Sequence, residues 1–375
     1  MTITRPGDSL SSVARRSCLN AGELARLNGL ADPRRLTAGL ALAVPGWEDT
    51  PLKTLEISAV PEQSAPGSVL EELLPSLSYV CPFCCAPNPD GRLDPEPDRR
   101  VLELAAAHGV PSLLTVANLD GDKGYSAALA HTLLGSDSAR QALLDGILAI
   151  LAQGPYSGVY LSFCYLHPFD RENYNAFLRL AAPALHDGGW YLVTALAPKE
   201  DDSERSLLCS AHDYAVHGAY ADRVILLSYD WGYAYSAPQA VSPLNRIRAV
   251  LDYAAEKLPL GKMSLALSGQ GYSWPLPWRL GDKAEAVSNS LARNLAVSSG
   301  AEVKLDELSR NSYFTYTDAA SQRHVIWFED LRSLNAKLGL IEERGLAGVS
   351  FIGSARLDRP ALGWLQSRYS PERLV

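Results

Sequence analysis

The feature of this sequence that most constrains its fold is a repeated alternation of short apolar segments with longer stretches of helical periodicity. Such alternation predicts parallel strands connected by crossover helices. One strand is predicted near Leu55, and seven more are predicted at 77–83, 110–118, 158–164, 190–197, 223–230, 262–268 and 347–353. Eight strand–helix units predict an α/β fold, a (β/α)8 TIM barrel with its functional residues at the carboxyl ends of the strands.

A longer interval separates the seventh and eighth predicted strands. Residues 275–325 contain a helical pattern at 283–297 and two strand-like segments, SYFTYTD and RHVIWF. These segments predict a small α+β insertion between strands 7 and 8, which would form one wall of a cleft at the barrel mouth.

The first 46 residues have a pattern of their own, so we divide the chain into 1–46 and 47–375. Ser9 is a helix N-cap candidate with Asp8 beside it, and Leu24, Leu27 and Leu30 form the apolar face of a second helix. An apolar segment then ends at the turn formed by Pro45 and Gly46. The predicted order is therefore strand, helix, helix, strand.

These residues resemble a LysM domain, in the PGDSL opening, the LNGL middle and the LTAGLALAVPG close. The resemblance implies binding to polymers that contain N-acetylglucosamine, such as peptidoglycan or chitin. It assigns the glycan contacts to Gly7, Asp8, Ser9 and the segment from Leu36 to Leu40. A cap or an oligomerisation module without sugar affinity is the alternative.

Composition excludes several classes of partner and location. The formal charge is −8, and Lys and Arg are scattered, so no nucleic-acid partner is expected. The chain has no apolar run of about 18 residues, and its first residues lack the pattern of a secretory signal. We expect no membrane partner and synthesis in the cytoplasm.

The predicted barrel resembles family 18 glycoside hydrolases, particularly LysM-bearing N-acetylglucosaminidases that act on spore peptidoglycan. The resemblance implies a protein of the spore or cell wall that binds such a glycan. Several sequence blocks carry the resemblance over nearly the whole chain, and they occur in the order and at the spacing of the family. The blocks are YVCPF, VANLDGDKGYSAALAHTLL, FDRENYNAFLRLAAPAL, TALAPK, HDYAVHGAYADRVILLSYDWGY, GYSW and EVKLDELSRNSYFTYTD.

The catalytic motif of that family is missing at the place where the resemblance puts it. The family carries DxxDxDxE on its fourth strand, where the Glu is the general acid and the preceding Asp orients the substrate's N-acetyl group. In this sequence the four acidic positions are occupied by Ser157, Tyr160, Ser162 and Cys164. None of these side chains is a carboxylate, and a thiol is a poor acid for a sugar oxygen. We predict no catalytic residue among them.

A sugar-binding surface is partly retained. The resemblance places a Trp under the sugar at the end of the eighth strand, and Ile352 stands there instead. Six residues at or near the barrel mouth are candidates for glycan binding, although packing of the mouth explains the aromatic ones equally well: Tyr229, Asp230, Trp231, Tyr233, Tyr272 and Trp274.

No metal site or cofactor is predicted. Cys81, Cys84, Cys85 and Cys164 lie near strand ends, but this spacing lacks the second matched pair of a zinc site, so buried reduced thiols are favoured. The seven histidines show no HExxH spacing, and there is no glycine-rich phosphate loop or GxSxG elbow.

Three functional hypotheses follow. The favoured one is a pseudoenzyme that binds glycan without cleaving it. The second is an active glycosidase whose acid is displaced, with Asp230 or Asp120 as the candidate. The third is cysteine-dependent chemistry at Cys164 with the thiols at 81–85.

Overall fold

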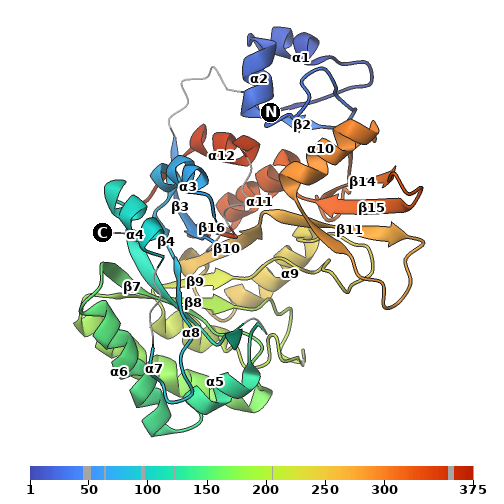
Figure 1. Cartoon of the computed structure of the whole chain (residues 1–375). Coiled ribbons are helices and arrows are strands. Elements are labelled where there is room, and N and C mark those ends of the chain that lie inside the picture. Colours follow the sequence, from blue (N-terminus) through green and yellow to red (C-terminus); the bar gives the residue numbers. More distant parts are fainter. Residues whose placement is uncertain are drawn as a thin grey trace.

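The centre of the computed structural model is a closed barrel of parallel strands (Figure 1). The structure describes residues 1–44, 52–62, 65–93, 98–121, 124–204, 206–353 and 359–374, without the side chains of 83–85. The last barrel strand pairs with both the seventh and the first, which closes the barrel and confirms the predicted fold. The eight barrel strands are β3 (Lys53–Val60), β4 (Tyr79–Val80), β6 (Ser112–Ala117), β7 (Tyr156–Ser162), β8 (Tyr191–Leu196), β9 (Arg223–Leu226), β10 (Met263–Ser268) and β16 (Gly348–Ile352).

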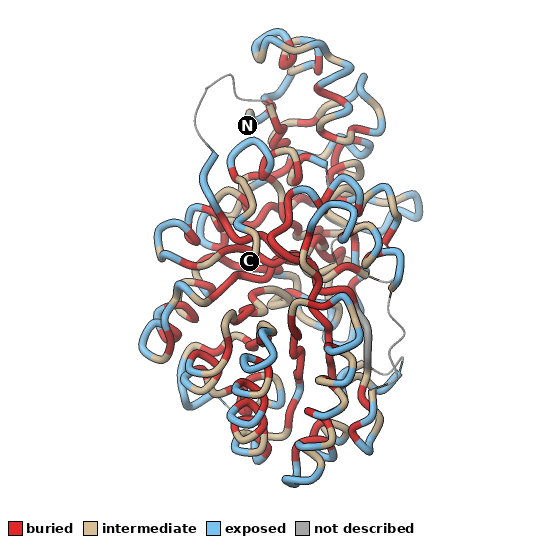
Figure 2. The backbone as a smooth tube through the Cα atoms, turned by 90° about the vertical axis from the view of Figure 1, so that its left-hand side faces the viewer, coloured by how far each residue is buried: buried red, intermediate tan, exposed pale blue. Residues whose placement is uncertain are grey.

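Helices surround the barrel and bury its outer surface, so that the strands are the most buried part of the molecule (Figure 2). Side chains alternate across each strand. On β7, Val159 and Leu161 pack outward against the helices, whereas Tyr160 fills the barrel interior. The helices that follow the strands are α3 (Gly67–Leu73), α4 (Arg99–Ala107), α5 (Ala127–Leu134), α6 (Asp137–Leu151), α7 (Arg171–Asp187), α8 (Tyr214–Tyr220), α9 (Leu244–Ala255), α11 (Leu331–Arg344) and α12 (Arg359–Gln366).

Several strand boundaries differ from the prediction. The segment 77–83 is not one strand, because β4 ends at Val80 and a second short strand, β5 (Phe83–Cys85), pairs with β6. Pro82 lies between them and has no N–H to donate to a ladder. On β7 the ladder covers 156–162 rather than 158–164, so Cys164 lies just beyond the strand.

The insertion is a five-stranded antiparallel sheet with one helix, α10 (Asn289–Ser299). The predicted helix start at residue 283 is wrong, because β12 extends to Ser288 and the Ser288 side chain caps α10 by accepting a hydrogen bond from the Leu291 N–H. The sheet order is β12 (Glu285–Ser288), β11 (Gln270–Leu276), β15 (Arg323–Phe328), β14 (Ser312–Thr317) and β13 (Lys304–Leu305).

The N-terminal residues form the predicted βααβ unit. Its strands β1 (Thr2–Ile3) and β2 (Ala41–Leu42) pair antiparallel, and α1 (Leu10–Arg16) and α2 (Ala21–Leu27) lie between them in the chain. Ser9 caps α1 as predicted by accepting a hydrogen bond from the Ser12 N–H, and the Ser12 hydroxyl accepts one from the Ser9 N–H. The reciprocal pair satisfies two backbone donors that the helix start would otherwise leave open.

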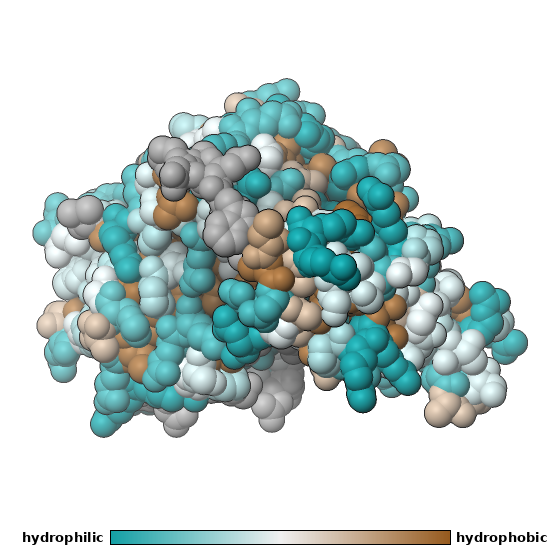
Figure 3. Space-filling view, turned by 90° about the horizontal axis from the view of Figure 1, so that it is seen from above, coloured by the Kyte–Doolittle hydropathy of each residue, from teal (hydrophilic) through white to brown (hydrophobic). Residues whose placement is uncertain are grey.

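This N-terminal unit and the insertion share one hydrophobic core. Leu24 and Leu42 are fully buried against Phe314 and Phe328 of the insertion sheet. Figure 1 shows the N-terminal unit beside α10, and from above the outer surface of this end is mostly hydrophilic (Figure 3). The apolar residues of the two parts are therefore used to join them.

Hydrogen bonds reinforce this junction. The hydroxyl of Thr37 donates to the Ala301 carbonyl at 2.8 Å, and the Val303 N–H donates to the Ala38 carbonyl at 3.0 Å. Gly39 lies so close to Val303 that a Cβ on Gly39 would overlap the Val303 carbonyl oxygen.

None of the helices in the described residues is long and apolar enough to cross a membrane.

We predict that Gly39→Ala weakens the junction between the N-terminal unit and the insertion. The new Cβ collides with the Val303 backbone, and the φ of +80° is unfavourable for alanine. The expected loss is about 2–4 kcal/mol in the free energy of unfolding, measured by chemical denaturation.

Gly7→Ala is the matched control, because Gly7 has a similar φ of +82° but no atom within 4 Å of the added Cβ. It should cost only about 1–2 kcal/mol, the price of the backbone conformation. Equal losses in the two variants would show that the close approach of Gly39 to Val303 contributes nothing to stability.

Candidate functional site

The four positions of the expected acidic motif lie along β7 and just beyond its end. Tyr160 points into the barrel interior, where it packs against Tyr79 and Ile225. Ser162 and Cys164 follow at alternate positions toward the mouth and are 6% and 1% exposed. Of the four positions, the structure therefore places Ser162 and Cys164 at the barrel mouth, Tyr160 in the interior and Ser157 at the opposite end of β7.

Asn118 fixes the position of Cys164. The Asn118 side chain, which follows β6, accepts a hydrogen bond from the Cys164 N–H and donates one to the Cys164 carbonyl, both at 2.9 Å. These bonds continue the pairing of β6 with β7 beyond the last strand residue. Sequence analysis missed Asn118, although its place at the end of a predicted strand was the available signal.

Tyr125 covers the same positions from the loop that precedes α5. Its hydroxyl lies 3.1 Å from the Ser162 Oγ, and its ring lies 6.1 Å from the ring of Tyr165. Tyr165 has a φ of +54°, a conformation that is costly for a bulky side chain and is often found at functional sites. Neither tyrosine was among the predicted site residues.

Cys164 is a neutral thiol at physiological pH. Burial raises its pKa to about 12, and the hydrogen bonds from Tyr125 and Ser162 only partly oppose this shift. Burial also raises the pKa of the Cys81 thiol well above its ordinary value. A nucleophilic or ligating cysteine needs the opposite shift, so the geometry disfavours the third hypothesis.

The predicted cysteine group also includes Cys84 and Cys85, whose side chains lie outside the described residues. Within the described ranges, no group of three or more His, Cys, Asp or Glu side chains could hold a metal ion.

Tyr229 and Asp230 form the opposite side of the mouth, after β9. Tyr229 packs against the barrel-interior cluster, as Ile352 does. Burial raises the pKa of Tyr229 well above its ordinary value, and the nearby Tyr125, Cys164 and Asp230 add to the shift. Asp230 has a φ of +60° and accepts a hydrogen bond from the Tyr272 hydroxyl at 3.3 Å. The insertion strand β11 therefore reaches the mouth.

The remaining predicted glycan contacts divide into exposed and buried residues. Tyr233 is 44% exposed, and its neighbour Tyr235, which was not predicted, is 62% exposed. Trp274 is fully buried, and its indole N–H donates to the Ser236 carbonyl at 2.7 Å. The prediction that Trp274 lines the cleft is wrong for this reason, because a buried ring has no face to offer a sugar. Tyr272 is also buried and acts here through its hydroxyl.

An open hollow lies beside the mouth. Asp230 lines it together with two further carboxylates, Glu200 and Glu204, and the ring of Trp231 forms part of the wall. Asp120, the other acid considered, lines a separate hollow with Leu129 and Ser126. Asp230 and Asp120 are therefore not alternatives within a single cavity.

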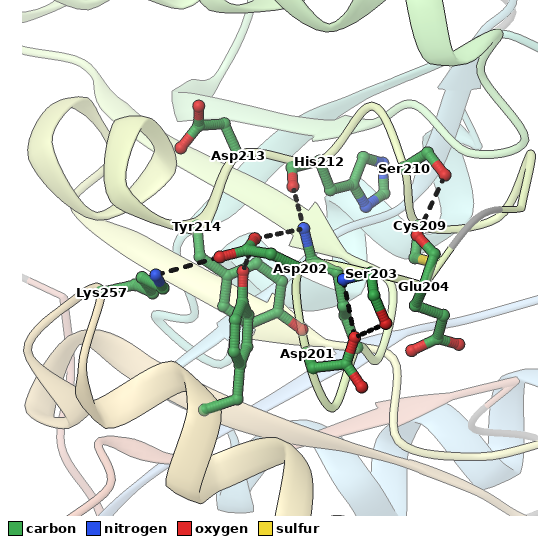
Figure 4. Close-up of polar contacts among 12 residues, drawn as sticks. Asp201, Asp202, Ser203, Glu204, Cys209, Ser210, His212, Asp213, Tyr214 and Lys257 are labelled. Atoms are coloured by element: carbon green, nitrogen blue, oxygen red, sulfur yellow. Dashed lines mark hydrogen bonds and ion pairs between the residues drawn. The ribbon is translucent and has the colours of Figure 1, made fainter.

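A polar network holds the loop that carries Glu200 and Glu204. Figure 4 shows Lys257 facing the Asp202 carboxylate, a pair at 3.1 Å, and the Ser203 backbone bonded to Asp201. The buried Lys199 donates to the His212 carbonyl at 3.2 Å. Residues 199–203 beside the hollow are thus held by polar contacts.

His212 connects this loop to the end of β7. Its Nδ1 accepts a hydrogen bond from the Ala197 N–H at 2.8 Å, so its Nε2 carries the proton and donates to the Phe163 carbonyl at 2.9 Å. Phe163 lies between Ser162 and Cys164. Burial lowers the pKa of His212 to about 4, so the imidazole is neutral at physiological pH.

We predict that the protein loses stability as the pH falls from about 6.5 toward 4. The unfolded chain binds a proton at His212 in this range and the native protein does not, so protonation favours unfolding. The expected loss from His212 is about 3 kcal/mol over the whole range, measured by chemical denaturation at several pH values.

His212→Gln is the comparison variant, because its amide can supply both an acceptor and a donor without titrating. It should be less stable than the wild type at pH 7 but show a flatter dependence on pH. The same slope in both proteins would contradict the assigned role.

In the N-terminal unit, the predicted glycan contacts are only partly open. Gly7 and Ser9 are exposed, whereas Leu36 is half-buried and packs against the core shared with the insertion. Asp8 forms an ion pair with Arg16 at 2.9 Å, and the hydrogen bond from Arg16 lowers the pKa of that carboxyl to about 2. Glycan binding by these residues stays a prediction.

Comparison with known families agrees with this architecture. Residues 97–352 match the family model described as Glycosyl hydrolases family 18, and residues 3–45 match the LysM domain model. The chain therefore belongs to glycosyl hydrolase family 18 and carries a LysM domain at its N-terminal end, as the sequence predicted.

Proteins of Bacillus species are similar to this chain over most of its length. The chain is 35% identical over 281 residues to the cortical fragment-lytic enzyme of Bacillus subtilis, covering 75% of this chain but only 65% of that protein. It is 28% identical over 299 residues to the cortical fragment-lytic enzyme of Bacillus anthracis, covering 79% of this chain and 69% of that one.

Among solved structures, the spore cortex-lytic enzyme SleL of Bacillus megaterium superimposes with a TM-score of 0.91 at 25% identity. The match covers 100% of this chain and 99% of that chain.

Proposed function

We propose that this protein binds a glycan of the spore or cell wall that contains N-acetylglucosamine, most simply peptidoglycan, and does not hydrolyse it. The observation that carries the proposal is the barrel mouth itself. Tyr160, Ser162 and Cys164 stand at the positions that the family resemblance assigns to acids, and Cys164 is a buried neutral thiol. The similarity to proteins named for spore-cortex lysis supports the choice of glycan.

The physical argument concerns the two charges that hydrolysis needs. A general acid must protonate the leaving oxygen, and its loss alone costs about 10²- to 10⁴-fold in rate. A carboxylate must also stabilise the positive charge that develops when the acetamide attacks. Neither Ser162 nor a thiol with a pKa of about 12 can fill these roles.

Binding needs fewer features than catalysis, and several remain. Tyr165 and Tyr233 offer exposed aromatic rings at the mouth, where sugar rings stack by their apolar faces. The LysM domain provides a second candidate contact, and its attachment to the insertion gives it a fixed position relative to the barrel.

An active glycosidase with a displaced acid is the second candidate. The hollow beside the mouth favours it, because Asp230 shares that space with Glu200 and Glu204. Most glycosidases use a pair of carboxyl side chains, one as the general acid and one as the base or nucleophile.

We predict retention without release when the protein is incubated with insoluble peptidoglycan. The protein should sediment with the polymer, and reducing ends should not increase above the buffer control. The Asp230→Asn variant tests the alternative within the same assay. Release by the wild type that this variant abolishes would establish the displaced-acid hydrolase instead.

We also predict that restoring the acids is not sufficient for hydrolysis. Ser162→Asp with Cys164→Glu supplies both carboxylates, but the new Glu enters a site that is only 1% exposed, and Ile352 still occupies the place of the stacking Trp. Release of reducing ends should remain at background.

The control for this restoration is Ser162→Asn with Cys164→Gln, which has nearly the same size without the charges. Thermal unfolding of both double variants shows whether each remains folded. Hydrolysis by the acidic variant alone would mean that only the acids separate this protein from an active enzyme.

A further inference from the structure

A group of aromatic side chains outside the barrel mouth has no role in the function proposed above. Phe169 lies in the 3₁₀ turn Pro168–Asp170, between β7 and α7, and is 66% exposed. Its ring stacks on that of His167, with centroids 4.8 Å apart and an angle of 16°. The ring of His131, from α5, meets Phe169 edge-on at 5.3 Å. We call His131, His167 and Phe169 the aromatic triplet.

The orientation of His131 is fixed by a buried carboxylate. Asp170 is fully buried, and its Oδ1 lies 2.8 Å from the His131 Nδ1 and accepts a second hydrogen bond from the Asn173 amide. A bond to Nδ1 leaves Nε2 as the ring atom for an outside partner, and the His131 side chain is 51% exposed. Its ring is therefore held in place at the surface.

Holding His131 in this way carries a cost. The other carboxylate oxygen of Asp170, Oδ2, is buried and has no hydrogen-bond partner among the described residues. A buried unpaired oxygen is unfavourable. Together with the two-thirds exposed Phe169 in the same turn, it marks a surface organised for something other than stability.

The triplet continues the surface of the barrel mouth. Tyr165, at the mouth, lies four residues before Phe169 in the chain, so their Cα atoms are at most about 14 Å apart. Leu166, between them, is buried and anchors the segment, while Tyr165 is 47% exposed. Two residues from a second segment of the chain contact this one. The ring of Tyr125 lies against that of Tyr165, and six residues later the ring of His131 lies against that of Phe169.

We propose that the aromatic triplet is an accessory subsite that holds the glycan chain where it leaves the barrel mouth. The inference rests on the proposed function and extends it. Its ligand class is an N-acetylglucosamine-containing polymer, because aromatic rings bind the apolar faces of such sugars and a fixed imidazole accepts a hydrogen bond from a hydroxyl. A polymer can bridge the mouth and the triplet, whereas a short oligosaccharide reaches only one of them.

The test compares ligand lengths on the full chain. Binding of an N-acetylglucosamine disaccharide and hexasaccharide is measured by calorimetry for the wild type, Phe169→Ala and His131→Ala. Phe169→Ala should weaken hexasaccharide binding about 3- to 10-fold and leave disaccharide binding unchanged. His131→Ala should show the same length dependence, and Phe169→Trp should bind the hexasaccharide at least as well as the wild type.

Leu280→Ala is the matched control, since Leu280 is a 93% exposed apolar residue on the insertion. It should alter neither affinity. The inference is overturned if Phe169→Ala binds the hexasaccharide like the wild type, or if it weakens both ligands equally. If the wild type binds neither ligand, the proposed function itself fails. This outcome differs from the one in which the wild type binds and Phe169→Ala has no selective effect, which overturns only the accessory subsite.

Discussion

The structure depends on the pairing of β16 with β3, which turns a row of parallel strands into a closed barrel. The two strands pair over five residues, beginning with Gly348 opposite Glu56. A Cβ at Gly348 would overlap the Glu56 carbonyl oxygen, so only glycine allows this approach. Glu56 itself is buried in the barrel floor and accepts hydrogen bonds from Tyr79, Ser264 and Arg223. Closure at the floor sets which side chains of every strand point inward.

The inward-facing positions fixed by this closure determine which side chains of β7 line the interior and the mouth. Once the register is fixed, Tyr160 must fill the interior, and Ser162 and Cys164 must occupy the mouth, whatever chemistry they carry. The fold imposes positions and the sequence supplies the groups, which is why one barrel can keep its architecture while the polar groups of its mouth change. Asn118 and His212 illustrate this independence of fold and chemistry. They hydrogen-bond to the backbone of Cys164 and Phe163, so these contacts do not depend on whether the side chains at the mouth are carboxylates.

The sequence predicted the barrel, the N-terminal βααβ unit and an α+β insertion between strands 7 and 8, because each depends on local periodicity. It failed where a contact joins distant segments. GYSW was interpreted as part of the cleft, but Trp274 belongs to β11 and is buried in the insertion. Asn118 and Tyr125 contact residues 46 and 37 positions further along the chain, and no local pattern reveals such pairs. The shared core of Leu24 with Phe328 was hidden for the same reason.

The junction between the LysM domain and the insertion also determines how the molecule can engage a polymer. A flexible linker lets two binding modules search for their sites independently, with an effective concentration set by linker length. Here the LysM domain is packed against the insertion, and the insertion reaches the mouth through Tyr272 and Asp230. Packing, and not a linker, therefore sets the spacing and angle between the LysM domain and the barrel mouth. Under the function proposed above, the protein would gain avidity only from glycan strands whose course matches this arrangement.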